Sequence, residues 1–330
     1  MSIDFNVKEV NWETDDYDSS CLTLEFEGKH VNYLIINSLR KICIDQIPMY
    51  ALHRDKIDIK RNNSVYDNTE MECRLSQLPL KRINHDVMFL PMKFYKNVNF
   101  ADLKREKHPN DTQNIELYLN VKNNNSSGVK YVSTNDLRIS VNNEVIESKK
   151  MYSGKKPITL IMLRPGEEFE CSMKGVLATG ELDGIFNASN AYYEQITENK
   201  FIFNIESSGQ MNEYELLLRG IDIIIEKLKI IGENVNQNQY NMILTENNSV
   251  KLEIVNEDYT CGGVICNMLQ DMETKVNYAG ITIPNFIEKN ISLIFVTNKK
   301  YKSIDVFNEA IDNSVKLYEN IKKKIANISK

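Results

Sequence analysis

The 330-residue sequence lacks the features of a membrane or secreted protein. No window approaches the run of about 18 apolar residues that a membrane-spanning helix needs. The first residues mix Asp, Lys and Glu where a signal peptide would carry an apolar stretch. The six cysteines are widely scattered without a Cys-x-x-Cys pair, which favours reduced thiols. These absences predict an intracellular protein with no membrane partner.

The motifs of common enzyme classes and metal sites are also missing. The sequence has no Gly-x-Gly-x-x-Gly, no Gly-x-Ser-x-Gly and no Asp-x-Asp-x-Asp cluster, which argues against a dinucleotide fold, a nucleophile elbow and a two-metal site. The four histidines lie 23 to 32 residues apart and form no His-x-x-x-His pair. The acidic run Asp15–Asp18 lacks the central glycine of a calcium loop. We therefore expect no catalytic residue, no cofactor and no metal.

The charge balance argues against nucleic-acid binding through a broad basic surface. The formal net charge is −6, whereas such binding draws its free energy from neutralised phosphates. Three local basic stretches keep a stand-alone nucleic-acid-binding protein open as an alternative, namely Arg54–Arg61, Lys149–Lys156 and Lys299–Lys302. A small-molecule enzyme with an unrecognised site is a third alternative.

The first part of the chain alternates between strand and helix periods. Cys21–Glu27 has the period of two that a half-buried strand requires. Between Val31 and Cys43 the apolar residues fall on one stripe of a helix. Met49–Lys60 again alternates like a strand, and a short helix is expected from about Asn68 to Leu78. This order predicts a mixed α+β unit.

A β-rich unit is expected from about residue 81 to residue 199, where short alternating runs are separated by Asn, Ser, Pro and Gly turns. Phe201–Glu206 resumes as a strand. A helix then runs from about Asn212 to Ile231, with a broad apolar face that we expect to end at Gly232. The Asn- and Gln-rich segment Glu233–Tyr240 has the composition of a linker.

The last segment repeats the opening order of elements. We expect strands at Val250–Val255, Val276–Pro284 and Ile291–Thr297, with helices at Asp258–Met272 and Ser303–Ala326. Asp258 is placed to cap the first of these helices. The apolar stripe of the last helix continues for about five turns, more than a sheet of about three strands can cover, so a partner helix is expected. We expect pairing of the two halves through Leu39, Ile42, Leu217, Ile221, Ile224, Leu228, Phe307, Ile311, Leu317 and Tyr318.

Several motifs, in their order, resemble the polymerase alpha-subunit family, which includes the bacterial alpha amino-terminal domain, the third subunit of nuclear RNA polymerase II and its archaeal counterpart. In the first half the matching segments are Asn37–Lys41, Ile47-Pro48, Ile57–Ile59, Gln77–Leu80, Ala191–Tyr193 and Phe201–Ser207. The final segment is similar to the family's small partner, which is the eleventh polypeptide of the nuclear enzyme and its archaeal counterpart. There the matching segments are Glu257–Thr260, Tyr278–Gly280 and Ile283-Pro284. Together the match spans about 300 residues.

The resemblance implies a fused heterodimer. Its α+β fold would contain two alpha-like dimerisation domains paired within one chain, one of them interrupted by a β-rich inserted domain. The first dimerisation domain would comprise residues 1–80 and 200–232, the inserted domain 81–199, the linker 233–240 and the second dimerisation domain 241–330. Large cytoplasmic DNA viruses are known for such fusions, which would place the protein in the host cytoplasm and in the virion.

The resemblance also implies the function. The chain would be a non-catalytic assembly platform of a DNA-directed RNA polymerase, whose active site lies in other subunits. Its partners would be the two large subunits, with small adaptor subunits as further candidates and little or no nucleic-acid contact. Arg40 matches the arginine that touches a large subunit in the family, and Asn37 and Lys41 flank it. Some relatives carry a four-cysteine metal cluster in the inserted domain, but only Cys171 lies there, so no zinc or iron–sulfur centre is expected.

Overall fold

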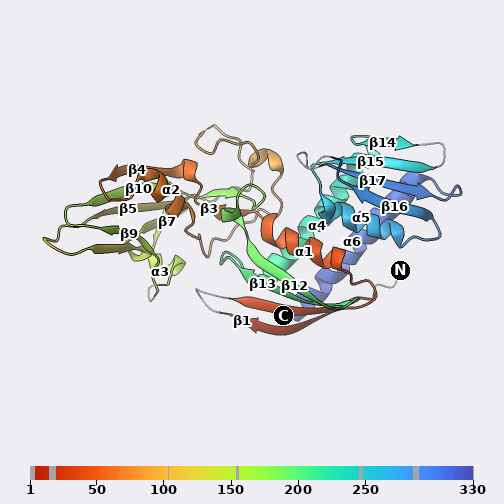
Figure 1. Ribbon diagram of the computed structural model, residues 1–330, viewed down its shortest axis with the longest axis horizontal. Helices are drawn as coiled ribbons and strands as arrows, with labels where there is room; N and C mark the ends of the chain where they lie inside the picture. The colour runs from red at the N-terminus through yellow and green to blue at the C-terminus, as the bar shows by residue number, and fades with distance from the viewer. Residues whose placement is uncertain are drawn as a thin grey trace.

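The computed structural model describes residues 4–14, 20–102, 104–153, 156–244, 248–284 and 290–329. The acidic run Asp15–Asp18 therefore lies outside the described residues. The molecule is elongated, with a β-rich lobe at one end, a body of helices and sheet in the middle, and a second small sheet at the other end (Figure 1). This arrangement is an α+β fold, as the sequence predicts.

The sheet of the body consists of four antiparallel strands in the order β1-β2-β13-β12. Their bounds are Asn6–Glu13 for β1, Cys21–Glu27 for β2, Ser189–Thr197 for β12 and Lys200–Ser207 for β13. The predicted strand at 21–27 is confirmed, and its Leu22, Leu24 and Phe26 are buried. Strand β1 was not predicted, because most of its side chains are exposed on this edge strand and give no alternating pattern.

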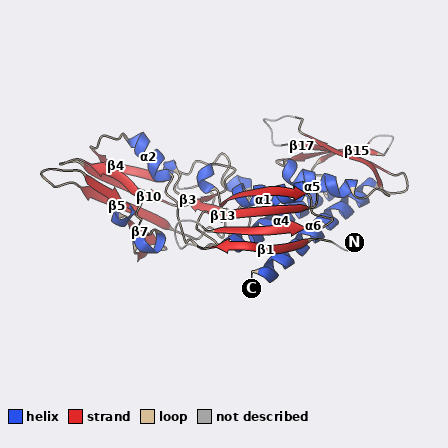
Figure 2. Cartoon of the chain, turned by 60° about the horizontal axis from the view of Figure 1, so that its bottom comes forward, coloured by secondary structure: helices blue, strands red, loops and turns tan. Residues whose placement is uncertain are grey.

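Two helices of the body cover this sheet (Figure 2). They are α1, Tyr33–Asp45, and α4, Glu213–Asn236, and their N-caps Asn32 and Asn212 each accept a backbone amide with the side chain. The prediction that α4 ends at Gly232 was wrong, so residues 233–236 belong to the helix and not to a linker. Gly232 is kept within the helix because α6 passes close by, leaving an added Cβ only 3.4 Å from Ile311 Cγ2.

The β-rich lobe has a five-stranded sheet in the order β4-β10-β5-β7-β8 and two smaller two-stranded sheets, β11-β3 and β6-β9. Its strands are β3 (Met49–Ala51), β4 (Ile57–Asn62), β5 (Ile115–Lys122), β6 (Lys130–Ser133), β7 (Arg138–Val141), β8 (Glu144–Ile146), β9 (Thr159–Leu163), β10 (Glu168–Lys174) and β11 (Val176–Ala178). Its helices are α2 (Asn68–Ser76) and α3 (Ser148–Met151). The single strand expected over 49–60 was wrong, because a 3₁₀ turn at Arg54–Lys56 divides it.

The lobe has a hydrophobic core of its own, with buried side chains that begin at Tyr50 and continue to Phe186. Strand β4 pairs with β10 of the lobe, and Met71 and Leu75 of α2 belong to the lobe's core. Part of the segment 50–80, which the sequence assigned to the first dimerisation domain, therefore packs with the lobe.

The far end of the molecule is a four-stranded sheet in the order β14-β15-β17-β16 with two helices. The bounds are β14 (Asn241–Leu244), β15 (Ser249–Val255), α5 (Tyr259–Gln270), β16 (Val276–Thr282), β17 (Asn290–Thr297) and α6 (Ser303–Ile328). The predicted cap of α5 is confirmed, since Asp258 Oδ1 accepts the Thr260 amide at 2.7 Å. Strand β14 was not predicted, because all four of its residues are exposed.

One hydrophobic core joins the body and the far end. Its buried side chains range from Phe5 to Ile325 and come from both sheets and from α1, α4, α5 and α6. The end of the last helix returns to the first strand, where the Lys324 ammonium donates a hydrogen bond to the Phe5 carbonyl. Residues that are far apart in sequence therefore form a single packed unit, distinct from the core of the β-rich lobe.

Candidate assembly interface

Helices α4 and α6 form an antiparallel pair at the centre of the shared core. Lys322 Nζ donates to both carboxylate oxygens of Asp222 at 2.6 and 2.7 Å. Near the other end of α4, Asn308 Nδ2 donates to Asn236 Oδ1 at 3.0 Å. Residue numbers rise along α4 as they fall along α6, so the contact runs along most of both helices. Side-chain ridges packed over this length bury the stripe that neither sheet could cover alone.

Helices α1 and α5 cross the same core, again antiparallel. Three hydrogen bonds join the two helices and their caps, from Asn32 to Asn267 at 2.6 Å, from Ser38 to the Thr260 carbonyl at 2.8 Å, and from Lys41 to Asp258. Each N-cap is thus held by a side chain of the other helix. Burial opposes ionisation of Asp258, but the Lys41 ammonium and the Thr260 amide outweigh it and hold the pKa of this carboxyl at about 2.

The residues predicted to mediate pairing of the halves are all buried in the shared core. They are Leu39, Ile42, Leu217, Ile221, Ile224, Leu228, Phe307, Ile311, Leu317 and Tyr318. Burial of ten large apolar side chains removes each from water at a gain of about 1.5–3 kcal/mol. The structure brings these residues together from helices α1, α4 and α6, and their combined area makes this core the main source of cohesion between the halves.

The three residues predicted to dock a large subunit lie on α1 and are all partly exposed. Arg40 Nε donates to Asn37 Oδ1 at 3.0 Å, so these two side chains form one polar group on the helix surface. Lys41 instead reaches across to Asp258 and binds the two halves together. The structure therefore separates the three residues into a surface pair and an inter-helix contact.

A buried ion pair at the interface was missed by the sequence reasoning. Lys227 Nζ lies 3.1 Å from Glu257 Oε1, with the two side chains only 9% and 10% exposed, and it donates to Gln46 Oε1 at 2.9 Å. Burial lowers the pKa of Lys227, but the nearby carboxylates of Glu257 and Glu181 raise it above the ordinary value, so the ammonium is kept. The signal was present, because Lys227 follows Ile224 by three residues, within the apolar stripe of α4.

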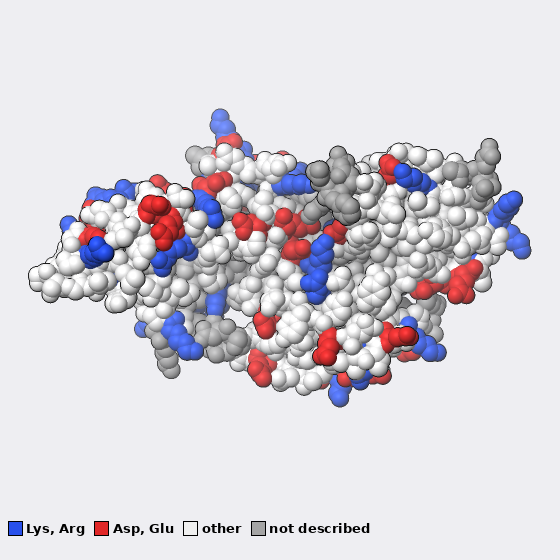
Figure 3. Space-filling view, viewed as in Figure 1, with Lys and Arg blue, Asp and Glu red and all other residues white. Residues whose placement is uncertain are grey.

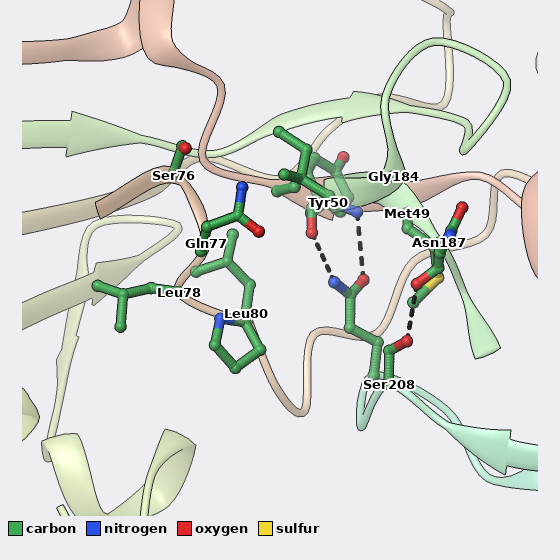
Figure 4. Close-up of a pocket in the computed structure, with 13 residues that line it drawn as sticks. Met49, Tyr50, Ser76, Gln77, Leu78, Leu80, Gly184, Asn187 and Ser208 are labelled. Carbon is green, nitrogen blue, oxygen red and sulfur yellow. Dashed lines mark hydrogen bonds between the residues drawn. The ribbon is translucent and has the colours of Figure 1, made fainter. Parts of the chain in front are cut away.

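The joint between the body and the β-rich lobe is a polar bridge beside a cavity of about 200 Å³ (Figure 4). The Tyr50 amide donates to Gln210 Oε1 at 3.2 Å, and Gln210 Nε2 donates to the Tyr50 carbonyl at 2.6 Å. The family-like segment Gln77–Leu80 lines the same cavity. Since Gln210 is buried, this pair of bonds replaces the strand partner that the Tyr50 backbone would otherwise require.

The local basic stretches do not combine into one surface on the face that Figure 3 shows, where Lys and Arg are interspersed with Asp and Glu. In the first stretch, Arg61 Nε lies 3.5 Å from Glu170 Oε2. The stretch Lys149–Lys156 includes residues outside the described part of the chain. Lys299 and Lys300 are exposed at the turn before α6. Interspersed acidic groups reduce the attraction that a phosphate backbone would feel.

Among the described residues, no group of three or more His, Cys, Asp or Glu side chains is arranged to hold a metal ion. The cysteines are free thiols, and four of the six are buried. Burial raises the pKa of Cys171, in the core of the lobe, to about 12. No helix in the described ranges is both long and apolar enough to cross a membrane.

The geometry of two helix pairs around one core agrees with a comparison to known protein families. Residues 25–228 match the model of the RNA polymerase Rpb3/Rpb11 dimerisation domain. The chain belongs to this family. The match extends from strand β2 to α4 and therefore encloses the β-rich lobe. The resemblance drawn from the sequence motifs is confirmed.

Individual relatives are RNA polymerase subunits. A protein of Acanthamoeba polyphaga mimivirus named as a DNA directed RNA polymerase subunit is 27% identical over 91% of this chain and 89% of its own length. The subunit rpac1 of DNA-directed RNA polymerases I and III from Dictyostelium discoideum is 25% identical over 72% of this chain and 85% of its own. Subunit Rpo3 of the polymerase of Methanocaldococcus jannaschii is 24% identical over 58% of this chain and 79% of its own. The mimivirus match extends over both halves.

Proposed function

We propose that this protein is a non-catalytic platform subunit of a DNA-directed RNA polymerase, on which the two large subunits assemble. The observation that carries the proposal is the antiparallel packing of α4 on α6 and of α1 on α5 around one core. Family membership makes each helix pair a dimerisation element. The polymerase active site would lie in the other subunits, and the chain would act within the infected cell if its source is viral, as the mimivirus relative suggests.

In this proposal the chain contains two dimerisation domains. The first is discontinuous and is interrupted by the inserted lobe, whose core begins at Tyr50. The second comprises α5, α6 and the sheet at the far end. Only the turn at residues 237–240 separates helix α4 from β14, so the tether is shorter than the linker expected over 233–240. A short tether gives an effective concentration on the order of millimolar, so pairing requires no second chain.

The large-subunit contact is assigned to the exposed face of α1, centred on Arg40 and its partner Asn37. An arginine held by a neighbouring amide presents its remaining donors in a fixed direction, which suits recognition of a carboxylate on a partner. Lys41 contributes less in this scheme, because Asp258 occupies its ammonium. Small adaptor subunits would bind elsewhere, and direct contact with nucleic acid would be slight.

The test is capture of large polymerase subunits by a tagged copy of the full chain, followed by mass spectrometry. Arg40→Glu should weaken capture at least tenfold while the thermal melt stays nearly unchanged, since a surface charge contributes about 0–1 kcal/mol to stability. Arg138→Glu, an equal charge reversal on an exposed strand of the lobe, is the matched control. Equal capture by both variants would remove Arg40 from the docking surface. Failure of the wild type to capture any large subunit, with salt-dependent binding to duplex DNA, would support the nucleic-acid-binding alternative.

A further inference from the structure

The two halves are built on one plan, so a second copy of the chain offers each half an alternative partner. The N-caps of α4 and α6 are Asn212 and Lys302. Counted from these caps, Lys227 in α4 and Leu317 in α6 occupy the same position. Both are buried in the assembled interface. One half therefore has a charged residue where the other has an apolar one.

The same asymmetry occurs in front of the other helix pair. The N-caps of α1 and α5 are Asn32 and Asp258, and the residues directly before them are Val31 and Glu257. Val31 is fully buried, and the Glu257 side chain is 10% exposed. The first half thus contributes Lys227 and Val31, and the second half contributes Leu317 and Glu257 at the corresponding positions.

The register of the helices shows what like halves would bring together. Lys227 lies five residues after Asp222 in α4, and Leu317 lies five residues before Lys322 in α6. Asp222 and Lys322 are bonded and the helices are antiparallel, so Lys227 and Leu317 lie level with each other. Because the two positions correspond, a pair of first halves would place Lys227 of one copy level with Lys227 of the other.

We propose that Lys227 and Glu257 direct the two halves of this chain to each other and exclude pairing of like halves from two copies. The inference rests on the internal pairing in the proposed function. In the observed arrangement the ammonium meets the carboxylate and Gln46. In a pair of first halves two buried ammonium groups would approach each other, and in a pair of second halves Glu257 would have no cation. Loss of a buried ionic partner should disfavour the self-paired dimer at least about a hundredfold.

The test compares the intact wild type with the double variant Lys227→Leu, Glu257→Val. This variant gives each half the residues of the other, Leu and Val, and removes the discrimination without leaving a buried charge. Both proteins are refolded from denaturant at concentrations from about a tenth of a millimolar to about a millimolar, near the effective concentration of the tether. Dimers are quantified by sedimentation and native mass spectrometry, and a thermal melt checks that the variant has folded.

Wild type should form only dimers in which unlike halves are exchanged. The double variant should show an association constant for dimers about twofold higher, because self-paired dimers become as favourable as exchanged ones. Equal association constants would overturn the proposal.

A second variant, Lys227→Cys with Glu257→Val, identifies the self-paired form. In that form the two cysteines at position 227 lie level and should give a disulfide-linked dimer, whereas in monomers and exchanged dimers each lies level with Leu317. Lys229→Cys, on the exposed side of α4, controls for chance oxidation. Absence of the linked dimer in the folded variant would contradict the inference. Capture of large subunits by wild type, measured separately, shows whether the proposed function itself holds.

Discussion

Two glycines of α4 allow the distances between its neighbours to be tested by the same chemical change. An added Cβ at Gly232 would lie 3.4 Å from Ile311 Cγ2, an ordinary contact, whereas one at Gly220 would lie 2.8 Å from Cys43 Sγ, closer than carbon and sulfur can approach. Alanine in place of glycine within a helix gains about 1 kcal/mol from backbone propensity. Overpacking in a core costs about 1–3 kcal/mol.

The two substitutions should therefore change stability in opposite directions. Gly232→Ala should raise the free energy of unfolding by about 0.5–1 kcal/mol, and Gly220→Ala should lower it by about 1 kcal/mol, the propensity gain being outweighed by the clash. Urea denaturation followed by circular dichroism measures both values. In a Cys43→Ala background the clash is removed, so Gly220→Ala should become stabilising by comparison with Cys43→Ala alone. Equal shifts of the same sign for both glycines would refute the helix separations described above.

Three further predictions concern charged and titrating groups. Lys227→Leu alone should lower the free energy of unfolding by about 3–5 kcal/mol because Glu257 is left buried without a cation, and Glu257→Val added to it should restore most of the loss in urea melts. Burial lowers the pKa of His85 to about 4, whereas an unfolded histidine titrates near 6.5; stability should therefore fall as the pH drops from about 6.5 towards 4, since only the unfolded state takes up the proton, and His85→Gln should flatten that slope. Asp258→Asn keeps the helix cap but loses the ion pair with half-exposed Lys41, at a cost below about 1 kcal/mol, while Asp258→Ala should cost about 1 kcal/mol more, and a larger loss for the asparagine variant in thermal melts would contradict the assignment.

Local patterns were sufficient for the elements with one buried face. The strand at 21–27 and the helix from Ser303 follow from apolar periods of two and 3.6, and the cap at Asp258 follows from its position before the helix. Edge strands β1 and β14 could not be predicted in this way, because exposed side chains carry no period. The end of α4 was misplaced, since glycine marks a helix stop in isolation but a close helix contact in the folded protein.

Contacts between the halves required the structure. The sequence indicated that the long stripe of α6 needs a partner, but nothing local determines which residue of α4 each residue of α6 meets. Lys227 lay within an apolar stripe, and its carboxylate partner is 30 residues away in the sequence, before another helix. Long-range pairing of this kind depends on the register of the helices, which is set only when the whole core is packed.

The contact between Lys324 and the Phe5 carbonyl brings the last helix beside the first strand. The two segments are continuous in space, although a gene encodes them at opposite ends. A gene that encoded the far sheet and its helices first, followed by the body and the lobe, would need only a short peptide to bridge that contact. We therefore expect a circularly permuted protein, opened at the turn 237–240, to reach the same native structure.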